Sequence, residues 1–323
     1  MNILVTGSAG YIGTLLVNRL LKEKIIDNIM GVDLLPPPDA IKPHQKLIWI
    51  RWDLVKDGWQ KEVLSYGKVD AVVHLAFKIR SPYGKVKETK EENVSASRNV
   101  FEFAFKNKIP RLIYSSSVAA YGAKEGNLGR LLKESDPLEE NISPYGLQKR
   151  LVEELLGKMV EGLHPKTHTI IVRLNSVTGP YGQGLKSKFG LITFFKKILP
   201  FVIEAHPAWA RQFIHEKDVE EIFSRLASIA PKPGRIDIYN AAPPSWLTAK
   251  DIARLLNKTT VKIPKFLIHP AFWVVWNLTF GVIPTHPDSA SGLIYPINVD
   301  GSRIGSIGFQ YKYTPGDALL GKR

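Results

Sequence analysis

The most constraining feature of this sequence is a regular alternation of short apolar segments with amphipathic stretches through residues 2–174. The apolar segments, which predict strands, are 2–6, 29–33, 47–51, 69–76, 111–116 and 169–174. The stretches with helical spacing of apolar residues are 11–24, 56–65, 91–106 and 145–160. Largely apolar strands that alternate with amphipathic helices are typical of a parallel sheet covered on both faces. We therefore expect an α/β fold with a doubly wound parallel sheet.

The pattern loosens after residue 175, where proline, glycine and aromatic residues become more frequent. A helix near 217–228 and a strand near 235–239 are expected to rejoin the sheet. We divide the chain into a large domain over 1–175, which 215–240 rejoins, and a smaller C-terminal substrate-binding lobe over 176–214 and 241–323. Such a lobe, packed at the carboxyl ends of the strands, would close a cleft where open α/β sheets bind ligands.

Composition and charge narrow the classes of protein. The chain has 323 residues and no cysteine, which excludes disulfides, thiolate metal sites and a cysteine nucleophile. No other set of side chains has convincing metal-ligand spacing, so no metal is expected. Lysine and arginine number 44 against 30 acidic residues, and the resulting net charge of +14 favours anionic partners. Residues 1–7 show no secretory signal, and we expect a cytoplasmic protein.

The longest apolar stretch, 266–284, is interrupted by His269, Pro270, Asn277 and Gly281. It is too broken to predict a transmembrane helix. We expect it to be a packed helix, with a membrane-surface helix as the alternative, and we do not expect membrane association.

A glycine-rich segment joins the first strand to the first helix. Residues 6–13 read Thr-Gly-Ser-Ala-Gly-Tyr-Ile-Gly. Gly7 permits a tight turn, Gly10 lets the backbone approach a pyrophosphate, and Gly13 lets helix and strand pack closely. The helix N-terminus offers N–H groups and a positive dipole to phosphates, so the segment predicts a dinucleotide site that includes Tyr11 and Ile12.

Two aspartates follow the next two strands. Asp33 lies twenty residues after Gly13, where a carboxylate can accept hydrogen bonds from a ribose 2′-hydroxyl and would repel a 2′-phosphate. This position favours NAD over NADP, and a loop-capping role is the alternative. Asp53 either holds an adenine amino group or caps the helix that follows it.

A serine-rich strand end and a tyrosine–lysine pair predict redox chemistry. Residues 114–122 read Tyr-Ser-Ser-Ser-Val-Ala-Ala-Tyr-Gly, and Tyr145 and Lys149 lie four residues apart on one helical face. A neighbouring ammonium and the positive nicotinamide ring stabilise a phenolate, so the pKa of Tyr145 should fall toward neutrality. Tyr145 could then take a proton from an alcohol while hydride leaves the same carbon, and a serine would orient that alcohol.

With these motifs the chain resembles the extended short-chain dehydrogenase/reductase superfamily, in its branch of NAD-dependent epimerases and dehydratases that includes UDP-glucose 4-epimerase. The resemblance runs nearly the whole length and implies a Rossmann-like NAD-binding domain over 1–175, with NAD as cofactor. It implies that Ser117, Tyr145 and Lys149 are catalytic. It further implies cofactor contacts from Gly7, Gly10, Tyr11, Ile12, Gly13, Asp33, Asp53, Leu54, Leu75, Ala76, Asn93, Ser115, Tyr145 and Lys149. Substrate contacts are implied for Ser117, Asn175 and Arg211.

Three departures from the family pattern bear on the substrate. Val118 and Ala119 stand where dehydratases carry an acidic pair, so dehydration is not expected. Gln212 stands where aspartate is usual, and the loop before Arg211 lacks the usual glycines, which weakens the case for a nucleotide-sugar. Phe77 is bulkier than the usual small residue and predicts a narrower or more apolar pocket.

The leading hypothesis is an NAD-dependent epimerase acting on a sugar, preferably nucleotide-linked, by transient hydride transfer with Tyr145 as general base. The first alternative is an NAD(P)-dependent alcohol dehydrogenase or ketone reductase with a more apolar substrate. The second is a non-catalytic NAD- or RNA-binding regulator, which the positive charge supports and the intact trio of Ser117, Tyr145 and Lys149 opposes. The expected partners are a small-molecule substrate and a second copy in a homodimer, and no nucleic acid is expected.

Overall fold

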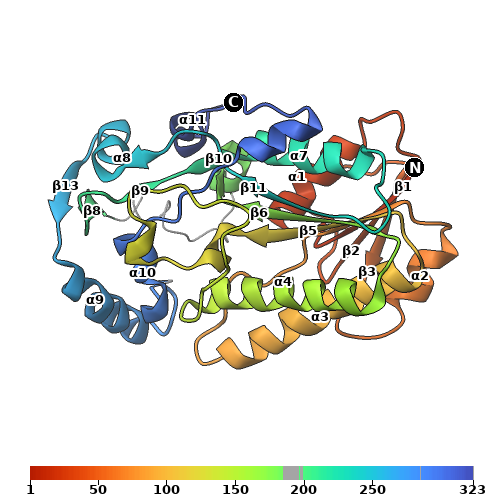
Figure 1. Cartoon of the computed structure of the whole chain (residues 1–323), viewed down its shortest axis with the longest axis horizontal. Coiled ribbons are helices and arrows are strands. Elements are labelled where there is room, and N and C mark those ends of the chain that lie inside the picture. The colour runs from red at the N-terminus through yellow and green to blue at the C-terminus, as the bar shows by residue number, and fades with distance from the viewer. Residues whose placement is uncertain (185–195, 197–198, 284, 323) are drawn as a thin grey trace.

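The computed structural model describes residues 1–184, 196, 199–283 and 285–322 (Figure 1). At its centre lies a seven-stranded sheet in the order β11-β6-β5-β4-β1-β2-β3, in which every neighbouring pair is parallel. The strands are β1 (Asn2–Thr6), β2 (Asn28–Asp33), β3 (Leu47–Arg51), β4 (Ala71–His74), β5 (Arg111–Ser117), β6 (His168–Leu174) and β11 (Ile236–Ala241). This confirms the Rossmann-like doubly wound α/β fold.

Helices cover both faces of the sheet because alternate strand residues point to opposite sides. Ile3 and Val5 of β1 pack with α1 (Tyr11–Leu20) and α7 (Glu216–Ser228) in one apolar core. Leu4, between them, packs in a second core on the other face. That face is covered by α2 (Trp59–Ser65), α3 (Val86–Lys106) and α4 (Pro144–Leu163), which lie below the sheet in Figure 1.

The strand order places the ligand crevice. From β1 the chain runs outward to β2 and β3, and it then crosses back so that β4 pairs with the other side of β1. The carboxyl ends of β1 and β4 therefore border the point where the strand order reverses, and open α/β sheets bind ligands at this point. The glycine segment follows β1 and Leu75-Ala76 follows β4, so both lie at this crevice.

In the part of the chain that the structure describes, the smaller lobe contains three two-stranded sheets and several helices around a core that includes Val202, Trp209 and Ile252. Its strands are β7 (Ser176–Thr178), β8 (Phe201–Glu204), β9 (Ala210–Arg211), β10 (Phe213–His215), β12 (Leu247–Thr248) and β13 (Thr259–Lys262). Its helices are α5 (Pro180–Gly184), α8 (Ala249–Leu255), α9 (Lys265–Leu278), α10 (Ser291–Ile294) and α11 (Pro315–Leu320). Short 3₁₀ turns are η1 (Val118–Tyr121), η2 (Glu125–Asn127), η4 (Pro287–Ser289) and η5 (Ser302–Ile307).

The apolar stretch 266–284 forms most of α9, and Pro284 lies outside the described residues. As expected, the helix packs on the core of the smaller lobe, through Ile268 and Phe272. Ile268 is nevertheless its one buried side chain, so the packing involves only one face of α9. Among the helices that the structure describes, none combines the length and the apolar character needed to cross a membrane.

Candidate active site

The glycine segment forms a tight turn in which two of the three glycines leave no room for a side chain. Gly7 has a φ of 72°, and a Cβ there would lie 2.5 Å from the backbone nitrogen of Ala76. A Cβ on Gly13 would lie 2.1 Å from the carbonyl oxygen of Gly7. Gly13 therefore allows α1 to pack closely against the turn, whereas the sequence pattern predicted close packing against the strand. Gly10 is the N-cap of α1 and offers no side-chain cap, and the first turn of α1 holds no acidic residue. The first turn of α1 therefore contributes no carboxylate of its own at the positive end of the helix dipole.

Asp33 lies directly beside this turn. Its Oδ2 accepts a hydrogen bond from the Ala9 N–H at 2.9 Å, and its Oδ1 accepts one from the Leu35 N–H at 3.0 Å. The Asp33 carboxylate therefore caps the loop formed by the glycine segment, which is the alternative role predicted for this residue from the sequence. Each oxygen has a further lone pair, so the same carboxylate could also accept a ribose hydroxyl.

Asp53 does not cap α2. Its Oδ1 accepts a hydrogen bond from the Val55 N–H at 3.0 Å, which closes a turn five residues before the helix N-cap, Gly58. The helix begins at Trp59, later than the sequence predicts, and the capping alternative is therefore wrong. The adenine contact stays a prediction, and the adjacent Leu54 is buried.

Asn93 links the loop after β4 to α4. Its Oδ1 accepts a hydrogen bond from the Lys78 N–H at 2.8 Å, and its Nδ2 donates to the Lys78 carbonyl at 3.0 Å and to Gln148 Oε1 at 2.7 Å. Both amide hydrogens have protein acceptors. Asn93 therefore positions the loop and the helix that carries Lys149, and its contact with the cofactor stays a prediction.

Ser117, Tyr145 and Lys149 meet at the carboxyl end of β5 and the start of α4. Ser117 is the last residue of β5, its Oγ accepts a hydrogen bond from the Ala119 N–H at 3.2 Å, and its side chain hydrogen-bonds Tyr145. Lys149 Nζ, one helical turn after Tyr145, donates to the Ser115 carbonyl at 2.6 Å. The structure thus brings the three predicted catalytic side chains together.

Burial shifts the pKa values of both Tyr145 and Lys149 in the protein alone. Burial raises the pKa of Tyr145 above its ordinary value, and the hydrogen bond from Ser117 only partly opposes this effect. Burial also lowers the pKa of Lys149 to about 7, with the charge of Glu153 opposing the shift. The predicted fall of the Tyr145 pKa toward neutrality requires the positive nicotinamide ring as well as Lys149, and it stays a prediction.

Phe77 lies against both members of this pair. Lys149 Nζ is 3.6 Å from the centroid of the Phe77 ring, and the Tyr145 ring meets the Phe77 ring edge-on at 5.9 Å. The ring contributes to the burial of the ammonium and makes this part of the site apolar. This contact agrees with the expectation of an apolar pocket.

A buried carboxylate that sequence reasoning missed lies one turn after Lys149. Glu153 accepts hydrogen bonds from Ser116 Oγ at 2.7 Å and from Arg173 Nε at 2.9 Å. Arg173 also donates to the hydroxyl of Tyr121 at 2.6 Å. Glu153 therefore ties α4 to β5 and β6, and the spacing of Tyr145, Lys149 and Glu153 by four residues was the signal that could have revealed it.

Arg211 and Asn175 lie close together where the smaller lobe joins the central sheet. Arg211 Nε donates to Ser176 Oγ at 2.9 Å, and among the described residues no carboxylate forms an ion pair with its guanidinium. Burial lowers the pKa of Arg211 to about 10. Asn175 Nδ2 donates to Gln212 Oε1 at 3.0 Å, and its Oδ1 accepts from the Ser176 N–H at 2.7 Å. Arg211 is thus poised for an anion, whereas the Asn175 amide is engaged by the protein.

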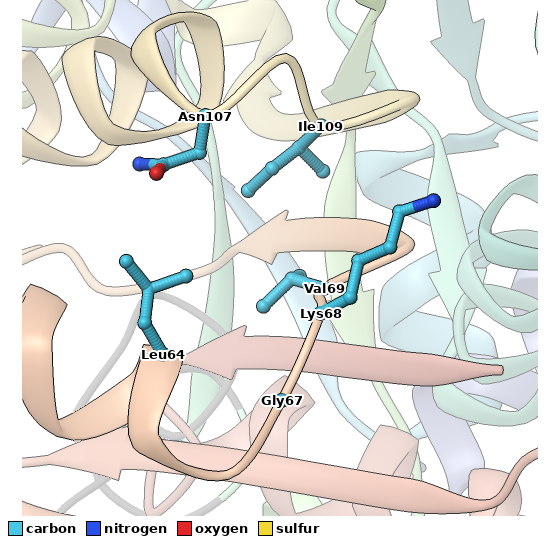
Figure 2. A pocket seen from close by; sticks show the side chains of 6 residues that line it. All are labelled: Leu64, Gly67, Lys68, Val69, Asn107 and Ile109. Atoms are coloured by element: carbon cyan, nitrogen blue, oxygen red, sulfur yellow. The ribbon is translucent and has the colours of Figure 1, made fainter.

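A separate hollow lies away from these groups (Figure 2). Its lining comes from Leu64, Gly67, Lys68, Val69, Asn107 and Ile109. These residues precede β4 and β5, so the hollow lies at the edge of the sheet where the strands begin. The candidate site lies at the opposite edge. No group of three potential metal ligands is found among the described residues.

Comparison with known proteins agrees with this geometry. A family model described as the NAD-dependent epimerase/dehydratase family matches residues 3–242. A dTDP-4-dehydro-6-deoxyglucose reductase of Escherichia coli is 26% identical over 276 residues, which are 80% of this chain and 83% of that protein. An uncharacterized UDP-glucose epimerase of Bacillus subtilis is 30% identical over 233 residues, which are 68% of this chain and 70% of that protein.

The fold also matches that of a solved enzyme. The UDP-glucose 4-epimerase of Thermotoga maritima, solved with UDP-glucose, superposes with a TM-score of 0.73 and 18% identity, over 99% of this chain and 97% of that one. At this identity the match concerns the fold. The family match covers most of the chain and confirms the resemblance drawn from the sequence motifs. The chain therefore belongs to the NAD-dependent epimerase/dehydratase family, whose cofactor is NAD.

Proposed function

We propose that this protein is an NAD-dependent epimerase of a nucleotide-linked sugar, with Tyr145 as the general base. The observation that carries the proposal is the meeting of Ser117, Tyr145 and Lys149 at the carboxyl edge of the sheet, the same edge that carries the glycine segment. The uncapped start of α1 and the neighbouring carboxylate of Asp33 suit the pyrophosphate and ribose of NAD. When bound, NAD would supply a hydride acceptor and a positive ring.

In this proposal Ser117 orients the sugar hydroxyl and Tyr145, as phenolate, removes its proton. The hydride on the same carbon leaves at the same time, so the alcohol becomes a ketone. Lys149 favours the phenolate, and Glu153 keeps Lys149 more basic than burial alone would allow. Return of the hydride to the opposite face of the ketone, with the proton returned by Tyr145, gives the epimer without net consumption of cofactor.

Arg211 supports a substrate that carries a diphosphate. A guanidinium without a carboxylate partner can donate two parallel hydrogen bonds to phosphate oxygens. The Escherichia coli and Bacillus subtilis relatives are named for dTDP- and UDP-sugars, which fits this chemistry. A homodimer is proposed by analogy with the family, and analytical ultracentrifugation tests it.

One observation favours a second candidate, an alcohol dehydrogenase or ketone reductase for a more apolar substrate. The Phe77 ring lies against Lys149 and Tyr145 and presents an apolar wall where the substrate carbon would lie. A reductase releases oxidised cofactor after every turnover, whereas an epimerase retains it.

The first experiment is mass spectrometry of the small molecules that the purified protein releases on gentle denaturation. Stoichiometric NAD or NADH, together with interconversion of UDP- or dTDP-hexoses without added cofactor, would establish the epimerase. An empty site and stoichiometric NADH formation with an alcohol would establish the dehydrogenase instead. Tyr145→Phe should lower kcat by about 100- to 10,000-fold while NAD binding is retained. Undiminished turnover by this variant would remove Tyr145 from its role as the base.

A further inference from the structure

The helix α9 is apolar on the side that faces solvent. Phe266, Trp273 and Leu278 are 71%, 58% and 76% exposed, and Ile268 is the buried side chain of the helix. Phe266, Pro270, Trp273 and Val274 recur at helical spacing, so they lie along one side of the helix. We define the α9 face as Phe266, Leu267, Trp273, Val274, Leu278 and Phe280, all of which are exposed.

The helix is thus apolar on its solvent side as well as on the side that packs on the lobe through Ile268 and Phe272. A surface helix normally buries its apolar stripe and exposes its polar side. Contiguous exposed apolar surface of this kind marks a site of contact with a membrane, a protein or a ligand. In Figure 1, α9 lies at the outer end of the smaller lobe, far from the β3 edge of the sheet, so no described element covers its outer side.

The α9 face is continuous with the loop that follows β4. The Tyr83 hydroxyl donates to Asn277 Oδ1 at 2.7 Å, and the Tyr83 ring lies 5.8 Å from the rings of both Trp276 and Phe280. The same loop exposes Ile79. The α9 face therefore adjoins the loop that carries Ile79 and, two residues before it, Phe77, which contacts the catalytic pair.

Charge indicates which partner covers this surface. Between Asp251 and Asp288 the sequence contains no aspartate or glutamate, and this interval includes all of α9. Lys262, in β13, and Lys265, the first residue of α9, are exposed and precede Phe266 closely in the sequence. The whole chain carries a net charge of +14. A second copy docked on the same face would bring these like charges together, whereas an anionic surface would complement them.

We propose that the α9 face docks the protein onto an anionic lipid bilayer, with α9 lying in the plane of the surface. The apolar side chains would enter the interface between headgroups and acyl chains, Trp273 would lie at headgroup level, and the lysines would pair with lipid phosphates. The helix is too short to span the bilayer, which agrees with its interruption by Pro270. This proposal replaces the sequence-based expectation of no membrane association, and it does not depend on the proposed reaction.

Vesicle co-sedimentation of the full-length protein tests the proposal. Vesicles of phosphatidylcholine alone are compared with vesicles that also contain phosphatidylglycerol, at low and at high salt. We expect binding to the anionic vesicles at low salt and weakened binding at high salt. Lys262→Gln and Lys265→Gln should each lower the partition coefficient by about fivefold, and the double variant should lower it by roughly 25-fold. The double variant Phe266→Glu and Trp273→Glu should abolish binding.

Matched controls separate a specific face from general stickiness. Ile25→Glu and Leu163→Glu alter side chains that are 54% and 60% exposed elsewhere on the molecule, and they should leave vesicle binding unchanged. Circular dichroism and thermal unfolding verify that each variant is folded, and Trp273→Ser replaces the double variant if that variant does not fold. Absence of binding, or equal binding to neutral and anionic vesicles, would overturn the proposal. Self-association that the α9 variants abolish, without vesicle binding, would assign the face to a second copy and would also overturn it.

Discussion

Replacing Lys149 by methionine should abolish turnover and at the same time stabilise the fold. Burial lowers the pKa of Lys149 from its ordinary value of 10.5 to about 7. The unfolded chain therefore holds this proton more tightly than the folded protein does, and the charged ammonium opposes folding. The penalty is fully present below pH 7 and disappears as the pH rises through 10.5. Linkage gives about 4 kcal/mol at pH 7 and about 2 kcal/mol at pH 9.

Part of this gain is offset by lost contacts. The variant loses the hydrogen bond from Lys149 Nζ to the Ser115 carbonyl and the contact with the Phe77 ring, which together cost about 1–3 kcal/mol. We therefore expect a net stabilisation of about 1–3 kcal/mol at pH 7. The dependence on pH is the sharper result, since the difference between the variant and the natural protein should shrink by about 2 kcal/mol between pH 7 and pH 9.

Urea unfolding at these two pH values measures the difference. Lys158→Met is the matched control, because Lys158 is an exposed lysine on the same helix and its replacement should change stability little at either pH. A Lys149→Met difference that stays constant between pH 7 and pH 9 would mean that Lys149 keeps an ordinary pKa in the folded protein. The reasoning from burial would then be refuted.

Three further substitutions test the proposed roles of other site residues. Gly13→Ala places a Cβ against the Gly7 carbonyl and should raise the Kd for NAD by about 10- to 100-fold, as measured by calorimetry. An unchanged Kd would show that the turn can relax. Asp33→Asn removes a negative charge beside the glycine segment and should raise the ratio of NADP affinity to NAD affinity by about five- to tenfold. An unchanged ratio would leave Asp33 a purely structural role. Arg211→Gln should raise the KM for a nucleotide-sugar by about 10- to 100-fold, as measured by substrate titration. Thermal unfolding should show no loss of stability. An unaltered KM would mean that the substrate diphosphate binds elsewhere.

The layered architecture could be predicted because local patterns encode it. The predicted strand over 47–51 coincides with β3, and the predicted helix over 145–160 lies within α4. The order of the strands could not be obtained in this way, because apolar periodicity shows which side of a strand is buried but not which strand lies beside it. The exposure of α9 was also hidden, since an apolar helix that packs in a core and one that faces outward have the same composition.

The part of the site that follows sequence spacing was predicted, and the part that arises from packing between layers was not. Tyr145 and Lys149 are neighbours on one helix, and Ser117 ends a strand that points at them. Glu153 and Arg173 meet across the sheet and α4, and only the fold brings them within 2.9 Å. Asn93 lies in the predicted region but satisfies its amide with the backbone of Lys78. The motif spacing therefore identified Asn93, but it did not reveal which groups its side-chain amide would bond.

The opposite pKa shifts of Tyr145 and Lys149 have one cause and one consequence. Burial disfavours charge on both groups, so it raises the pKa of the phenol and lowers that of the ammonium. Near neutral pH the protein alone therefore keeps Tyr145 protonated, and it is a weak base. A positive charge placed beside the phenol would favour its phenolate, and the low dielectric that raises its pKa would strengthen this effect. It follows that Tyr145 should become an effective base only when a cationic ring lies in the crevice, which couples proton removal to the presence of the hydride acceptor.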